Sequence, residues 1–444
     1  MSSSTGGNPR PRLVIIGGGF GGLSAATALH GFPGDITIID RKNHHTFQPL
    51  LYQVATAGLS PGEIAAPIRG ILGKQKNVRV LLGEVTGFDL ERRKVNVSGI
   101  EVGYDYLIVA AGATHSYFGH DQWAPLAPGL KTIEDALEIR RRVLLAFEIA
   151  ERQETVTGTH QPVHFVVVGA GPTGVELAGT LAEIANRSIP RDFRATNPRE
   201  THIILVEGAP RVLPGYPEDL SRSAERQLRR LGVDVRTSAM VSAVEPGRIQ
   251  IGDQYIPSTV TLWAAGVAAS PLGRLLGAAT DRAGRVEVEP DLSIPGHPEV
   301  FVIGDLASFR HTADGKPVPG VAPAAMQEGR WVAANILRDL RNKPRVPFRY
   351  RDKGTLATIG RAAAVANFGK LHLSGFLAWL TWLFVHLMYL VGFRNRVLVF
   401  IEWAWSYFTY QRSARLITGN CELPGQEQLT PAQPREPEKP LAAD

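Results

Sequence analysis

Two glycine-rich loops, each placed between an apolar strand and a helix, constrain the fold of this chain more than any other feature. The first lies in "RLVIIGGGFGGLSAATAL" and the second in "HFVVVGAGPTGVELAGTLAEIA", with glycines at Gly17, Gly19, Gly22, Gly169, Gly171 and Gly174. In such a unit the glycines allow a tight turn, close approach to a diphosphate and close packing of helix on strand. Free N–H groups at the helix N-terminus then bind the phosphates. The chain is therefore predicted to be an α/β protein with two Rossmann-like dinucleotide-binding domains.

Each loop is followed by a second strand that ends in an acidic residue. "DITIID" ends in Asp40 and "HIILVE" ends in Glu207, the latter delayed by the long insertion "NRSIPRDFRATNPRE". A carboxylate at this strand end accepts hydrogen bonds from ribose hydroxyls and repels a 2′-phosphate. Glu207 therefore favours NADH over NADPH at the second loop, although an acid that merely ends a strand in solvent gives the same pattern.

Composition excludes several classes of protein. The chain has 444 residues, which suggests about three domain-sized units. Its net charge is +6, and its basic residues are scattered, so nucleic-acid binding is not expected, while a mildly basic surface suits anionic lipid. Cys421 is the single cysteine, which excludes an internal disulfide, a CxxC redox pair and a thiolate zinc site. We expect no metal site.

Both ends of the chain are expected to be disordered. Residues 1–10 have no apolar segment typical of a signal peptide. Residues 419–444 are rich in Pro, Gln and Glu, a composition typical of disordered segments.

A third motif, "VFVIGDLASF", places Gly304 and Asp305 at the end of another apolar strand. The order of the three motifs resembles the two-dinucleotide-binding-domain flavoproteins, in which the first loop holds FAD, the second holds NAD(P)H and the aspartate bonds the FAD ribityl chain. The resemblance implies one FAD, held non-covalently by Gly17, Gly19, Phe20, Gly22, Asp40, Ala111, Gly112 and Asp305. It implies an NADH site at Gly169, Gly171, Gly174, Glu207 and Gly266.

The same resemblance predicts the domain organisation. "YDYLIVAAGA" and "TLWAAGVAAS" are similar to the two crossover strands between the halves of these proteins. The FAD-binding domain is accordingly expected to be discontinuous, formed by residues 11–113 and 285–370. The NADH-binding domain, residues 114–284, would be inserted into it.

Further motifs resemble one family, the type II NADH dehydrogenases, which are single-subunit NADH:quinone oxidoreductases of respiratory chains that do not pump protons. They are "NHHTFQPLLYQVATAGLSP", "GATHSYFGHDQW", "LWAAGV", "DKGTLATIGRAAAV" and "SGFLAWLTWLFVHLMYLVGFRNR", and the resemblance covers roughly residues 10 to 418. Disulfide reductases need a cysteine pair beside the flavin and sulfide:quinone reductases need several cysteines, whereas this chain has only Cys421. The resemblance implies that NADH reduces FAD and that FAD reduces ubiquinone or menaquinone. It leaves open which quinone is used and whether the chain forms a homodimer.

Two residues are expected to act at the flavin. Glu176, expected on the first turn of the second loop's helix, resembles a family residue beside the nicotinamide, although the helix dipole favours a carboxylate there in any case. Gln327 matches one glutamine of the family's segment A-Q-x-A-x-Q-Q-G on the quinone side, or else simply caps a helix. This chain departs from that segment at Pro323 and Glu328.

Residues 371–418 are expected to anchor the protein to a membrane. Residues 374–393 carry no Asp, Glu, Lys or Arg, and Glu402, Ser406, Thr409 and Ser413 form one polar stripe on a following aromatic-rich helix. Arg394 and Arg396 lie between the two segments. We expect a pair of amphipathic helices lying in the membrane surface, on the cytoplasmic face of the inner (plasma) membrane, with a transmembrane span of 374–393 as the alternative.

Two other functions fit part of the pattern. A soluble NADH-dependent flavin reductase for a protein acceptor such as ferredoxin would use the apolar C-terminus to dock its partner. A membrane-tethered NAD(H) sensor would need no flavin turnover.

Overall fold

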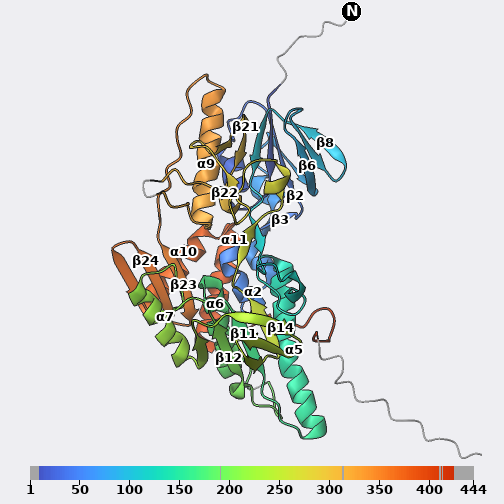
Figure 1. Ribbon diagram of the computed structural model, residues 1–444, viewed down its shortest axis with the longest axis vertical. Helices are drawn as coiled ribbons and strands as arrows, with labels where there is room; N and C mark the ends of the chain where they lie inside the picture. The colour runs from blue at the N-terminus through green and yellow to red at the C-terminus, as the bar shows by residue number, and fades with distance from the viewer. Residues whose placement is uncertain (1–9, 191, 313–314, 410–411, 413, 425–444) are drawn as a thin grey trace, which may run out of the picture.

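The computed structural model describes residues 10–190, 192–312, 315–409, 412 and 414–424. Its two largest sheets, which are mainly parallel, lie one above the other along the long axis of the molecule (Figure 1). Each sheet carries one of the two glycine loops, and we call the two units the first and second glycine-loop domains. The predicted α/β class is confirmed. Residues 1–9, expected to be disordered, lie outside the described part.

The first glycine-loop domain is built on a six-stranded sheet with the order β20-β21-β9-β1-β2-β5. These strands are Ser293–Ile294, His297–Val302, Tyr106–Val109, Arg12–Ile16, Asp35–Asp40 and Val78–Leu82. All pairs are parallel except β20 with β21. Strands β9 and β21 come from opposite sides of the second domain in the sequence, so the predicted discontinuity of this domain is confirmed.

Two helices pack together beside this sheet, α1 (Phe20–Ala28) and α9 (Ala322–Asp339). They approach so closely that a β-carbon at Gly329 would lie 2.3 Å from the carbonyl oxygen of Gly21. A small antiparallel sheet completes the domain, formed by β6 (Val85–Asp89), β7 (Lys94–Val97) and β8 (Ile100–Gly103).

The second glycine-loop domain has a four-stranded parallel sheet with the order β13-β12-β11-β17. These strands are Val233–Arg236, His202–Val206, His164–Val168 and Val260–Trp263. Its helices and smaller antiparallel sheet are α5 (Ile133–Thr157), α6 (Pro172–Glu183), α7 (Glu218–Arg230), β14 (Val241–Glu245), β15 (Arg248–Ile251) and β16 (Gln254–Pro257). The near-continuous apolar strands β11 and β12 are buried, as parallel strands covered on both faces require.

The two segments that connect the first and second glycine-loop domains form a pair of strands. Strand β10 (Ala113–His115) runs antiparallel to β18 (Val267–Ala269). Residues after β18 already pack into the first domain, where Leu276 is buried in the core and α8 (Leu272–Leu275) lies against it. The chain thus returns near residue 270, earlier than the expected boundary at 285.

The C-terminal unit begins earlier than the expected boundary at 371. A three-stranded antiparallel sheet of β23 (Thr355–Gly360), β24 (Ala363–Phe368) and β25 (Leu371–Ser374) lies beside α6 and α7 in Figure 1. A β-carbon at Gly179 of α6 would lie only 1.6 Å from the carbonyl oxygen of Ile359. Residues 355–370, expected in the FAD-binding domain, therefore pack on the second glycine-loop domain instead.

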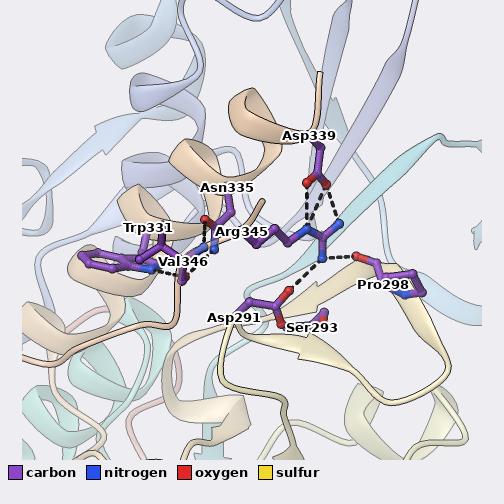
Figure 2. Close-up of polar contacts among 8 residues, drawn as sticks. All are labelled: Asp291, Ser293, Pro298, Trp331, Asn335, Asp339, Arg345 and Val346. Atoms are coloured by element: carbon purple, nitrogen blue, oxygen red, sulfur yellow. Dashed lines mark hydrogen bonds and ion pairs between the residues drawn. The ribbon is translucent and has the colours of Figure 1, made fainter. Parts of the chain in front are cut away.

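The connection from α9 to this C-terminal sheet is fastened to the first domain by Arg345 (Figure 2). Its guanidinium bonds both oxygens of Asp339, the carboxylate of Asp291 at 2.9 Å and the carbonyl of Pro298 at 2.7 Å. The next residue, Val346, exchanges two hydrogen bonds with Asn335. The connection is thereby held along the face of α9.

Helices α10 (Phe376–Tyr389) and α11 (Phe393–Thr409) each bury one side and expose the other. Their inner sides reach the protein core through Ala378, Trp382 and Val399, all at most 2 % exposed. Of the predicted polar stripe of α11, Glu402 and Ser406 are half-buried, Thr409 is exposed and Ser413 lies outside the described residues. Asn395 near the start of α11 is buried. Among the residues described, no helix has both the length and the hydrophobicity needed to cross a bilayer.

The outer sides of these two helices carry many exposed apolar side chains, a set which we call the apolar stripe. Its large side chains are 48–81 % exposed: Phe376, Leu377, Leu380, Phe384, Met388, Phe393, Phe400, Ile401, Trp405 and Phe408.

Part of the predicted C-terminal disordered tail is ordered. Arg141 of α5 donates hydrogen bonds to the carbonyls of Asn420 and Glu422, at 2.8 and 2.7 Å, and Leu423 is buried in the core. The expectation for residues 419–424 was therefore wrong, because composition does not reveal this specific anchoring. Residues 425–444 lie outside the described part.

Candidate functional site

The first glycine loop, residues 17–22, leaves open space at the N-terminus of α1, and we call such a loop and helix end a glycine cradle. Gly17 has a φ of +100°, and a β-carbon there would lie 2.3 Å from the carbonyl oxygen of Ala110. A β-carbon at Gly22 would lie 1.9 Å from the carbonyl oxygen of Gly17, so this glycine brings helix and strand together. No atom lies within 4 Å of a β-carbon at Gly19, the N-cap of α1, and no side chain caps the helix. These features fit a diphosphate bound to backbone N–H groups.

The second loop repeats this geometry at the N-terminus of α6. Gly169 has a φ of +98°, and a β-carbon at Gly174 would lie 1.8 Å from its carbonyl oxygen. Gly171, the N-cap of α6, again faces open space without a side-chain cap. The chain therefore contains two cradles of the same construction.

The two acidic strand ends are also held alike. The carboxylate of Asp40 accepts from the N–H groups of Gly18 at 2.6 Å and Lys42 at 2.7 Å. That of Glu207 accepts from Ala170 at 2.6 Å and Ala209 at 2.8 Å. Each carboxylate is thus fixed beside its loop, where a ribose bound next to the diphosphate would lie.

The other residues expected at the first cradle lie nearby, with one difference. Ala111 and Gly112 follow β9 beside Gly17, and Asp305 lies in the turn η5 (Gly304–Leu306) at the end of β21. Phe20 instead directs its ring at His45 and Phe47, with centroid distances of 4.9 and 5.9 Å. On this geometry Phe20 would reach a phosphate only through its backbone N–H.

A pocket lies where the two glycine-loop domains meet, with a free volume of about 130 Å³. The first domain contributes Gln48, Leu51 and Tyr52, and α6 contributes Thr173 and Glu176. The remaining lining residues are His115, Leu130, Lys131, Trp263, Ala264, Gly266 and Val267. Of the sequence-predicted residues, Glu176 and Gly266 are therefore brought together here.

Glu176 lies one turn into α6 rather than in its first turn. Burial raises the pKa of its carboxyl well above the ordinary range, opposed in part by the backbone N–H of Thr358 on β23. Tyr52 is buried on the facing wall, and burial together with the Glu176 charge raises the pKa of its phenol. The pocket thus holds a buried carboxyl with a raised pKa beside a buried phenol.

Sequence reasoning missed Tyr52, His115, Lys131 and Trp263 as lining residues. Tyr52, His115 and Trp263 were within motifs already noted for their family resemblance, which is the one signal that could have found them. Lys131 reaches the pocket from the loop before α5, a proximity that only the folded chain reveals.

Gln327 does not line this pocket. Its amide group donates to the carbonyl of Arg351 at 3.0 Å and to that of Pro323 at 3.1 Å. Its amide oxygen accepts from the N–H of Arg351 at 3.0 Å. The side chain therefore ties α9 to the segment that leads into the C-terminal sheet.

Its neighbour Glu328 is a buried carboxyl beneath the turn that carries Asp305. It is 2 % exposed and accepts a hydrogen bond from the N–H of Gly304 at 2.5 Å. Burial raises the pKa of Glu328 to about 7; the Gly304 hydrogen bond opposes this and the charge of Asp305 adds to it.

This pKa predicts how Glu328 affects stability as pH changes. A carboxyl with a raised folded-state pKa stabilises the fold below its unfolded value, near 4.5, and that contribution is lost as pH rises to about 7. Glu328→Gln keeps an acceptor for Gly304. The free energy of unfolding of this variant should therefore rise relative to that of the parent by up to about 3 kcal/mol between pH 4.5 and pH 8. Urea unfolding at both pH values measures this, with the exposed Glu148→Gln as control. An equal difference at both pH values would contradict the assignment.

Comparison with known proteins identifies the family. Residues 11–329 match the model of the pyridine nucleotide-disulphide oxidoreductases, and residues 353–411 match the NDH2 C-terminal domain. The chain is 48 % identical over 434 residues to a type II NADH:quinone oxidoreductase of Mycobacterium tuberculosis, covering 94 % of this chain and 91 % of that protein. This chain belongs to the type II NADH:quinone oxidoreductases. A second such protein of the same organism is 47 % identical, covering 92 % of this chain and 90 % of that protein.

Solved structures agree with this fold. NDH2 of Plasmodium falciparum in complex with NADH has a TM-score of 0.82 at 21 % identity, covering 92 % of this chain and all of that one. A sulfide:quinone oxidoreductase of Aquifex aeolicus reaches 0.70 at 20 % identity, covering 87 % and 92 %. The family model for the C-terminal domain begins at residue 353, close to the start of β23. Family membership implies a flavin and NADH as the redox pair of this chain.

Proposed function

We propose that this chain oxidises NADH with a bound FAD and passes the two electrons to a quinone of a respiratory membrane. The observation that carries this proposal is the pair of equivalent glycine cradles, one in each of the two domains that line the pocket, joined to a C-terminal unit with an exposed apolar stripe. FAD, when bound, accepts hydride from the nicotinamide and releases the electrons to the quinone.

FAD is assigned to the first cradle because the additional residues expected for it gather there. Asp40 would bind the ribose of its adenosine half, and Gly19 leaves open space at the diphosphate position. Asp305 lies at the same edge of the sheet, where its carboxylate would bind the ribityl chain. Glu328 holds that turn through the N–H of Gly304.

NADH is assigned to the second cradle, with its nicotinamide directed into the pocket between the domains. Thr173 and Glu176 line the pocket one turn from the cradle. A neutral Glu176 could donate a hydrogen bond to the carboxamide and so orient the ring, and it needs no general-base role for hydride transfer. Lining residues from both domains would exclude water around the reacting rings.

We propose that the quinone reaches the flavin from the side of α10 and α11. These helices pack on the segment that lines the pocket: Trp403 donates to Gln53 at 2.7 Å, and Trp382 lies against Tyr52. Gln327 would act here by holding the segment at Arg351 rather than by touching the quinone.

The apolar stripe is proposed to lie in the headgroup region of a membrane, at the cytoplasmic face of the inner (plasma) membrane. A stripe of ten large apolar side chains is more than an isolated soluble surface normally exposes. Arg394, exposed beside Phe393, is well placed for lipid phosphates.

The donor preference depends on Glu207. NADH should be oxidised with a higher kcat/KM than NADPH, because the 2′-phosphate of NADPH would meet the carboxylate held by Ala170 and Ala209. Glu207→Gln should lower the ratio of kcat/KM for NADH to kcat/KM for NADPH about tenfold, since a nearby like charge is worth about 1–2 kcal/mol in a partly screened site. Steady-state kinetics with both donors measures this. Equal kcat/KM values in the unaltered protein would contradict the assignment.

The function itself is tested by adding NADH and a quinone to the purified protein. NADH-dependent quinone reduction, with FAD released on denaturation, is the expected result. Oxidation of NADH only with a ferredoxin, or binding of NADH without turnover, would instead support the two other functions.

A further inference from the structure

Phe118 combines two unusual properties for a large aromatic residue. It is 67 % exposed, and its backbone has a φ of +53°. The left-handed conformation is rarely adopted by bulky residues, and such strain persists only where the surrounding structure imposes it. The cores and the glycine cradles do not account for this residue.

The surroundings of Phe118 fix it at the rim of the pocket. The N–H of Ser116 donates to the carbonyl of Gly266 at 3.2 Å, and Trp263 donates from Nε1 to the carbonyl of Ser116 at 2.8 Å. Trp263 and Gly266 both line the pocket. The turn that carries Phe118 is therefore attached directly to the pocket wall.

Gly266 gives the Phe118 ring its position. A β-carbon at residue 266 would lie 2.6 Å from Cζ and 2.9 Å from Cε2 of Phe118. The ring thus occupies the space that any side chain at 266 would take. Beside it Val267, also a lining residue, is 57 % exposed, so the two side chains form an apolar rim.

We propose that the Phe118 ring packs against the nicotinamide half of NADH and closes the rim of the pocket over it. This inference rests on the proposed function. The adenosine ribose belongs at Glu207, whereas the reacting ring must reach the wall formed by the first domain at Gln48 and Tyr52. Of the two halves of the dinucleotide, the nicotinamide half is therefore the one that passes this rim, and an aromatic side chain offers it a flat apolar face.

The test compares Phe118→Ala, Phe118→Leu and Gly266→Ala with the parent, using NADH and a short-chain soluble quinone. Phe118→Ala should raise the KM for NADH about three- to tenfold with little change in kcat, because a lost aromatic contact weakens binding by that factor. The KM of Phe118→Leu for NADH should lie between that of the parent and that of Phe118→Ala. An unchanged melting temperature is expected for both, because the side chain is exposed.

Gly266→Ala displaces the ring without removing it, so it should also raise the KM. The KM of the double variant, Phe118→Ala with Gly266→Ala, should not exceed the higher of the two single-variant KM values, since both substitutions act on one contact. Ile100→Ala, an equally exposed apolar residue on β8, should leave the KM unchanged. If Phe118→Ala leaves the KM unchanged while the parent oxidises NADH, the inference is overturned, even if Gly266→Ala raises it. A parent that does not oxidise NADH would instead refute the proposed function.

Discussion

Replacing Leu377, Phe384, Phe400 and Phe408 together by serine should release this protein from membranes. Each of these side chains is more than half exposed and belongs to the apolar stripe of α10 and α11. Burying a large apolar side chain in lipid is worth about 1.5–3 kcal/mol, so four of them contribute about 6 kcal/mol or more. Membrane partitioning should therefore fall by at least about four orders of magnitude. Flotation of the purified variant with liposomes measures this.

NADH oxidation with a soluble acceptor should survive in that variant, while reduction of a long-tailed quinone in liposomes should collapse. The matched control replaces four apolar residues of similar exposure elsewhere: Leu82, Ile100, Val156 and Leu275. That control should still bind the liposomes. If the stripe variant floats with the vesicles as the parent does, the membrane surface lies elsewhere.

Substitution is preferable to deletion here. Truncation at about residue 371 would remove Trp382, Leu390 and Val399 from the core, together with the strand β25. The resulting loss of activity would report on folding as much as on the membrane.

Valine substitutions in the two glycine cradles should separate the two dinucleotide sites. A β-carbon at Gly22 or Gly174 would lie within 2 Å of the carbonyl oxygen that opens its loop, so a larger side chain must push the helix from the strand. Loss of two charge-assisted hydrogen bonds to a diphosphate costs about 3–6 kcal/mol, which corresponds to at least a hundredfold weaker binding.

The two variants should fail differently. Gly22→Val should be purified without FAD and without activity. Gly174→Val should keep FAD that a chemical reductant still reduces, whereas NADH no longer does. Gly31→Val, at an open surface position, should behave as the parent, and circular dichroism should show all three folded. Loss of FAD from Gly174→Val with retention in Gly22→Val would reverse the assignment of the two cradles.

Local sequence patterns were sufficient for the parts of the fold that repeat a known unit. The strand–glycine–helix units were predicted because each serves a local geometric need, and the structure contains both; Asp40 and Glu207 each accept a hydrogen bond from a backbone N–H of the neighbouring loop. Family membership likewise confirmed the resemblance found from the longer motifs.

Contacts between distant segments could not be predicted in the same way. The sheet of β23–β25 joins the second domain through Gly179 and Ile359, and the residues around Asn420 are held by Arg141. These contacts join residues more than 170 positions apart, and no periodicity encodes them. The quinone-side role of Gln327 rested on a motif alone, and its side chain proves to be engaged with Arg351.

Electron transfer from NADH to quinone is tested by a stopped-flow record of flavin absorbance in the purified protein, mixed first with NADH and then with a quinone. NADH should bleach the flavin within the time of one turnover. The quinone should then restore the colour at a rate that accounts for steady-state turnover. A flavin that NADH does not bleach, or that recovers only with oxygen or a protein acceptor, would contradict electron transfer from NADH to quinone.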